Sequence, residues 1–70
     1  MDFGKNTKII ITYKWPAREH EPLIQEMGPG TLVPAIGDSV FLHGSGWKVD
    51  YRLIRNDPDE QIQYVLLDLL

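Results

Sequence analysis

The chain has 70 residues, a formal net charge of −3 and no cysteine. A chain of this length fits one domain, so we expect residues 1–70 to fold as a single unit that buries only ~60% of its unfolded surface. The lack of cysteine excludes disulfides and thiolate metal sites and fits a reducing compartment, so we predict a cytoplasmic protein. The acidic balance disfavours duplex binding, because affinity for phosphates normally requires an excess of Lys and Arg.

We expect neither a targeting segment nor a membrane segment. Lys5 and Lys8 interrupt the apolar run that a signal peptide would require. No stretch approaches the ~20 apolar residues of a membrane-spanning helix. The sequence therefore predicts no membrane partner.

The first predicted element is a β-strand over residues 8–15, KIIITYKW. This stretch is rich in β-branched and aromatic residues, and its large apolar side chains alternate. The residues on the predicted core face are Ile9, Ile11, Tyr13 and Trp15. Pro16 cannot donate a hydrogen bond to a neighbouring strand, so the strand should end there or continue only as an edge.

A short helix is predicted near residues 21–27. Pro22 suits the first helical position and Gly28 suits the position just after the last turn. The side chains that would share one side of this helix are Leu23, Ile24 and Met27. The alternative is an irregular loop anchored by the same three side chains. Beyond it, residues 31–34 favour a short strand.

Residues 34–55 have the pattern of a β-hairpin. The apolar residues on the shared face have even numbers before the turn and odd numbers after it. They can therefore face one another only if the two residue numbers of each cross-strand pair add up to an odd sum. Pairing Leu42 with Val49 meets this condition, and the turn would then be Ser45-Gly46 or a four-residue loop over 44–47. Glycine at 44 and 46 could supply the positive φ that a tight turn requires.

A second hairpin follows and would complete a three-stranded antiparallel meander. Pairing Leu53 with Ile62 places Arg55 opposite Glu60, where an ion pair could form. In this register the residues facing the core are Ile62, Tyr64 and Leu66, and those facing outward are Val65, Leu67 and Leu69.

The segment GDSVFLHGSGW, residues 37–47, resembles the opening hairpin of small SH3-like β-barrels. Many of these have a Gly-Asp-x-Val start, an alternating strand and a glycine turn, and some, such as the KOW-type domains of translation and transcription proteins, bind RNA or protein. The resemblance implies an architecture only, because the basic residues of an RNA-binding member are missing here. We therefore expect a mostly β fold, a small antiparallel SH3-like barrel or meander of four to five strands, with at most one short helix near 21–27.

Catalytic, metal and cofactor sites are not expected. His20 and His43 are the two histidines, and neither belongs to a recognised pattern of metal ligands. No carboxylate is clearly placed to orient His43 as a base for Ser39 or Ser45. The aromatic residues are in phase with aliphatic residues on their own strands, which indicates a core more than a stacking platform for single-stranded nucleic acid. We predict that the protein is not an enzyme.

The candidate interaction surface has two parts. On the first hairpin, two residues are out of phase with the core face, and on the last strand an apolar row faces outward. These residues are Phe41, His43, Val65, Leu67 and Leu69. The row could be covered by residues 17–30, by a second copy or by another protein. We expect a non-enzymatic protein-interaction module, for which an accessory or inhibitory role and a homodimeric state are both open. The alternative is a nucleic-acid-associated, KOW-like small barrel.

Overall fold

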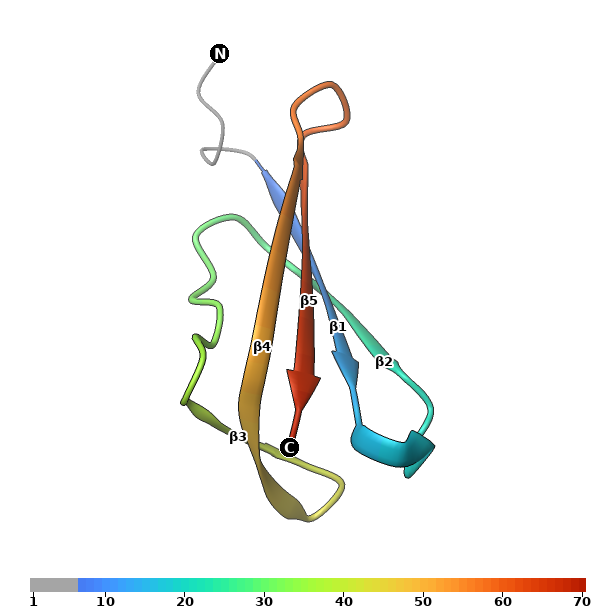
Figure 1. Ribbon diagram of the computed structural model, residues 1–70. Helices are drawn as coiled ribbons and strands as arrows, with labels where there is room; N and C mark the ends of the chain where they lie inside the picture. Colours follow the sequence, from blue (N-terminus) through green and yellow to red (C-terminus); the bar gives the residue numbers. More distant parts are fainter. Residues whose placement is uncertain (1–6) are drawn as a thin grey trace.

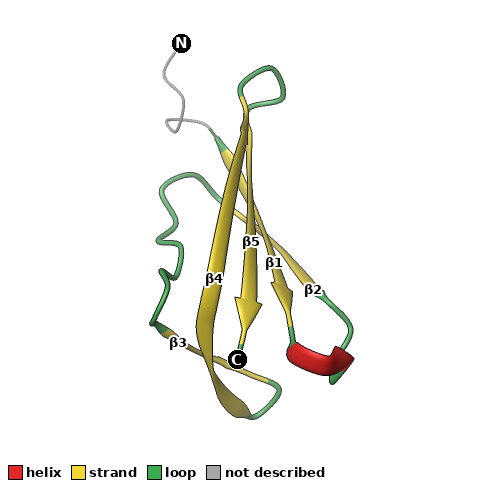
Figure 2. Ribbon diagram, in the orientation of Figure 1, coloured by secondary structure: helices red, strands yellow, loops and turns green. Residues whose placement is uncertain are grey.

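A computed structural model describes residues 7–70 as a five-stranded sheet that curls into a half-barrel (Figure 1). The elements in chain order are β1 (Lys8–Lys14), the 3₁₀ helix η1 (Pro16–Arg18), β2 (Leu23–Met27), β3 (Ser39–Leu42), β4 (Ser45–Asp57) and β5 (Ile62–Leu69). Strands dominate and η1 is a single short turn (Figure 2). The prediction of a mostly β fold with four to five strands is confirmed. Lys5, used above against a signal peptide, lies outside the described residues.

The sheet is mixed, with the strand order β2-β1-β5-β4-β3. β5 lies in the centre, parallel to β1 and antiparallel to β4, so the sheet is not antiparallel throughout as expected. A central strand is hydrogen-bonded along both of its edges, but only a covered face buries its side chains. The core covers one face of β5, whereas Tyr64 and Leu66 on the other face stay partly exposed.

The prediction for β1 is confirmed. Ile9, Ile11, Tyr13 and Trp15 are all buried, while Lys8 and Lys14 are exposed. The strand ends before Pro16, which occupies the first position of η1.

The helix predicted near 21–27 is wrong, because these residues include strand β2. β2 pairs antiparallel with β1, from Leu23 opposite Tyr13 to Met27 opposite Ile9. A helix of one or two turns is marginal in water, whereas pairing satisfies the backbone groups on the open side of β1. The strand predicted for residues 31–34 is also wrong, since they belong to the loop that joins β2 to β3.

The β3–β4 hairpin turns two residues earlier than predicted. Its two-residue turn is His43-Gly44, with φ of 53° and 76°. Val40 pairs with Trp47, so the odd-sum rule and the shared core face are preserved. The predicted turn at Ser45-Gly46 is wrong, and Gly46 does not have a positive φ.

A β-bulge at Asp50 decides which residues of β4 face the core. Val49 pairs with Leu69 and Tyr51 pairs with the preceding residue, Asp68, so Asp50 is an extra residue on β4. An extra residue reverses the alternation of side chains beyond it. Val49 is buried, but Tyr51 and Leu53 are about half exposed on the opposite face.

The bulge also reverses the predicted faces of β5. Leu53 pairs with Leu66 rather than with Ile62. The residues of β5 in the core are Val65, Leu67 and Leu69, which are 1%, 0% and 3% exposed. The prediction that they face outward is wrong. They pack in one cluster with the buried residues of β1, so the same chain covers them and no second copy is required.

The core lies on the concave face of the sheet, and we call the opposite, convex side the outer face. The loop over residues 28–38 runs from β2 to β3, the two edges of the sheet (Figure 1). Val33 of this loop packs against the core, and Arg52 Nη1 donates a hydrogen bond to the Pro34 carbonyl at 3.5 Å. The loop therefore closes part of the open side of the half-barrel.

Candidate functional site

Phe41 is the most exposed Phe, Tyr or Trp among the described residues, with 75% of its surface accessible. It lies on β3, where its neighbours Val40 and Leu42 pack against the core. Side chains alternate along a strand, so Phe41 points to the outer face. The predicted orientation of this residue is confirmed.

β3 is an edge strand whose other side has no neighbour among residues 7–70. The Val49 N–H donates to the Asp38 carbonyl and the Val49 carbonyl accepts from the Gly37 N–H, each at 2.9 Å, so Asp38 and Val49 form a pair that is hydrogen-bonded toward β4. Residues next to such a pair direct their backbone groups away from the partner strand. Ser39 and Phe41 accordingly present their N–H and C=O groups at the free edge, beside the exposed ring.

Four aromatic rings from distant parts of the chain meet beside the hairpin turn. His20 and His43 stack with ring centroids 4.5 Å apart and an interplanar angle of 17°. Trp15 contacts both imidazoles, with centroids 5.2 Å from His20 and 5.0 Å from His43, and Trp47 lies 6.0 Å from Trp15. We call these four residues the aromatic cluster. It joins the turn of the β3–β4 hairpin to the end of β1 and to the segment before β2.

The aromatic cluster fixes the hairpin turn in place. Trp47 Nε1 donates a hydrogen bond to the Leu42 carbonyl at 2.9 Å, across the two turn residues. Trp15 is 7% exposed, and its Nε1 is buried with no hydrogen-bond partner among the described residues. A buried donor without a partner costs about 1–3 kcal/mol, so ring packing must offset this cost.

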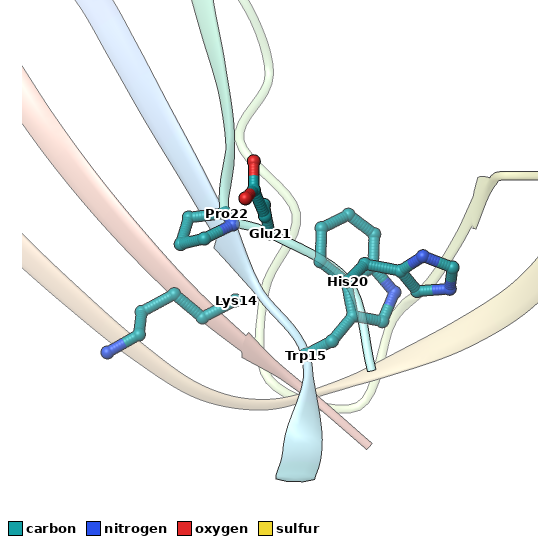
Figure 3. A pocket seen from close by; sticks show the side chains of 5 residues that line it. All are labelled: Lys14, Trp15, His20, Glu21 and Pro22. Atoms are coloured by element: carbon teal, nitrogen blue, oxygen red, sulfur yellow. The ribbon is translucent and has the colours of Figure 1, made fainter. Parts of the chain in front are cut away.

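A shallow pocket of about 250 Å³ lies beside the aromatic cluster (Figure 3). Its lining residues are Lys14, Trp15, His20, Glu21 and Pro22. Figure 3 shows the Lys14 amine directed away from the Trp15 ring, with the Glu21 carboxylate on another side of the pocket. The pocket has an aromatic wall, Trp15, with the positive charge of Lys14 and the negative charge of Glu21 near its rim. Such a surface suits contact with a side chain.

The arrangement of the two histidines does not favour a metal ion. The nitrogen lone pairs of an imidazole lie in the ring plane, and the planes of His20 and His43 are nearly parallel, so the lone pairs do not converge on one ion. Within residues 7–70, no group of three or more His, Asp or Glu side chains could hold a metal. No helix in the same range is long and apolar enough to cross a membrane.

The predicted interaction residues separate into two groups. Phe41 and His43 are exposed on the β3–β4 hairpin, whereas the three residues of β5 lie in the core. The contacts of His20 with His43 and of Trp15 with the hairpin turn were not predicted. No sequence signal could have found them, because long-range pairing of β1, β5 and β4 brings these segments together.

The sequence matches no known family model, and searches of the curated proteins and of the solved structures find no match.

Proposed function

We propose that the chain is a non-enzymatic protein-interaction module that binds an extended segment of another protein at the free edge of β3. The observation that carries this proposal is Phe41, a 75% exposed ring on an unpaired edge strand. Strand addition supplies backbone hydrogen bonds, and a large apolar side chain beside the edge supplies an anchor.

The surroundings of Phe41 support this proposal. Ile36, in the turn that leads into β3, is 63% exposed and adds apolar surface close to the strand in sequence. The aromatic cluster holds the hairpin turn, so little conformational freedom would be lost when a partner binds. Natural proteins usually protect an edge strand with charged residues or proline, and Ser39–Leu42 contains neither.

The alternative of a nucleic-acid-associated barrel has less support. Lys8 Nζ lies 2.8 Å from Glu26 Oε1, Arg52 donates to a backbone carbonyl, and Arg55 lies over the Tyr64 ring. These basic groups are engaged within the chain and do not form one stripe for a phosphate backbone.

The proposal is tested by affinity capture with wild type, Phe41→Ala and a matched control, Leu32→Ala. Leu32 is 94% exposed on the 28–38 loop, outside β3. We expect a protein that is captured by wild type and Leu32→Ala, is lost with Phe41→Ala and persists after nuclease treatment. Loss of a hot-spot side chain typically costs at least ~2 kcal/mol, or roughly thirtyfold in affinity.

Two results would contradict the proposal. Capture that is equal for Phe41→Ala and wild type would exclude the β3 edge. Salt-sensitive binding of oligonucleotides, with no protein captured, would favour the nucleic-acid alternative.

A further inference from the structure

The outer face of the sheet carries large apolar residues that no described segment covers. Across β2, β1, β5 and β4, one row of side chains is Glu26, Ile10, Tyr64 and Arg55, and the next row is Ile24, Thr12, Leu66 and Leu53. Ile24 is 66% exposed and Leu53 is 50% exposed. An apolar centre with charges at its sides is typical of an interface.

The outer face also has a projection and a hollow. The hollow has a volume of about 310 Å³ and lies over β5 and β4. Its lining residues are Thr12, Leu53, Arg55, Tyr64, Val65 and Leu66. The projection is Ile24 on β2, the cross-strand partner of Thr12, which lines the β1 side of the hollow.

We propose that a second copy of this chain packs on the outer face, sheet against sheet, about a two-fold axis that runs along the strands between β1 and β5. This axis exchanges β1 with β5 and β2 with β4. Ile24 of each copy then enters the hollow of the other. Aligned packing of this kind is the common arrangement of two stacked sheets.

The charges of the outer face agree with the same axis. Glu26 and Arg55 lie at opposite sides of one row, so each meets the opposite charge of the second copy. Within one chain Glu26 already pairs with Lys8 and Arg55 lies over the Tyr64 ring, so the contacts between copies add to these and do not replace them. Lys14 on β1 and Asp68 on β5 are cross-strand neighbours. The axis places Lys14 of one copy opposite Asp68 of the other copy. A two-fold axis across the strands would instead bring Lys8 against Lys14, and such like-charge contacts are unfavourable.

The size of the face predicts a dimer that dissociates on dilution. Four strands at ~4.8 Å each and the 7 residues of Lys8–Lys14 at ~3.3 Å each span roughly 19 by 23 Å. Because the face is convex, the two copies together cover at most about 900 Å², below the ~1,200–2,000 Å² of stable interfaces. We therefore expect a dimer with a micromolar Kd. This inference is independent of the proposed β3 site, which lies beyond β4 at the edge of the sheet.

Charge reversal tests the proposal by sedimentation velocity over a wide concentration range. In Glu26→Arg alone, the introduced guanidinium faces Arg55 in both symmetry-related contacts, and in Arg55→Glu alone the introduced carboxylate faces Glu26 in both. Each variant should weaken dimerisation roughly tenfold or more. An equal mixture of the two variants places opposite charges in both contacts of a heterodimer, so its dimerisation should return toward that of wild type. Circular dichroism confirms that each variant is folded.

The matched control is Glu60→Arg, which makes the same charge change in the β4–β5 loop. It should dimerise like wild type. Three results would overturn the proposal: a wild type that is monomeric at millimolar concentration, a dimer that neither reversal weakens, and a mixture that dimerises no better than the separate variants. Loss of partner capture by Phe41→Ala would leave this result unchanged, so the two proposals fail separately.

Discussion

Truncation of Leu67 tests which face of β5 belongs to the core, and Leu66 supplies a control of the same chemistry. Leu67 is 0% exposed and lies between Tyr13 on β1 and Arg52 on β4. Leu66 is partly exposed on the outer face. The two residues are adjacent and both are leucine, so their difference in cost reports the orientation of the strand.

The expected magnitudes follow from burial. Leu67→Ala in a fully buried site should lower the free energy of unfolding by about 2–5 kcal/mol, because it loses apolar contacts and leaves a cavity. Leu66→Ala, already in contact with solvent, should cost about 1 kcal/mol or less in the monomer. A chain of this size has a total stability of roughly 4–10 kcal/mol, so Leu67→Ala should remove a large fraction of it.

Urea unfolding followed by tryptophan fluorescence measures this difference, since Trp15 is buried and becomes exposed on unfolding. The titrations are done at low protein concentration, so that association through the outer face does not contribute. A difference of ~2 kcal/mol between the variants corresponds to roughly 8–16 °C in Tm. Val65→Ala, a smaller truncation at a 1% exposed site, gives a milder measurement if Leu67→Ala does not fold. Equal costs, or a larger cost for Leu66→Ala, would refute the bulge at Asp50 and the register of β4 with β5.

Two further predictions concern the hairpin turn and alkaline pH. Gly44→Ala should lower the free energy of unfolding by about 1–2 kcal/mol, because φ at Gly44 is +76°. Gly46→Ala should be neutral or slightly stabilising, since φ at Gly46 is not positive and nothing lies within 4 Å of the added Cβ. Equal melting temperatures for the two variants would contradict the turn at His43-Gly44. Burial raises the pKa of Tyr13 above its usual value of 10.0, so above about pH 10 the unfolded chain ionises this group first and stability falls as the pH rises. Tyr13→Phe should therefore lose less stability than wild type between about pH 8 and pH 11 in urea titrations, and an identical loss would show that Tyr13 does not contribute.

Local patterns in the sequence predicted part of this structure correctly. Alternation in residues 8–15 gave the strand β1 and its buried face, and Pro16 gave its end. The odd-sum rule placed Val40 and Trp47 on one face of the hairpin, although the turn residues were wrong. These features depend on neighbouring residues, so a single sequence is enough to find them.

The candidate site was predicted only in part. The phase of β3 identified Phe41 as exposed, because alternation along one short strand determines it. The free edge beside Phe41 and the stacking of His20 on His43 depend on strand order and on segments that are far apart in sequence. Such contacts have no local signal.

The tertiary structure alone decided which face of β5 is buried and that residues 21–27 contain a strand and not a helix. Alternation gives two possible faces for an apolar strand and does not say which one is buried; the extra residue at Asp50 reversed the choice for everything beyond it. The signals at Pro22 and Gly28 favoured a helix, but β1 had an open side that β2 could pair with. The sequence by itself therefore determined which residues alternate and where the first strand stops, while the neighbours of each strand determined which side of it became the core.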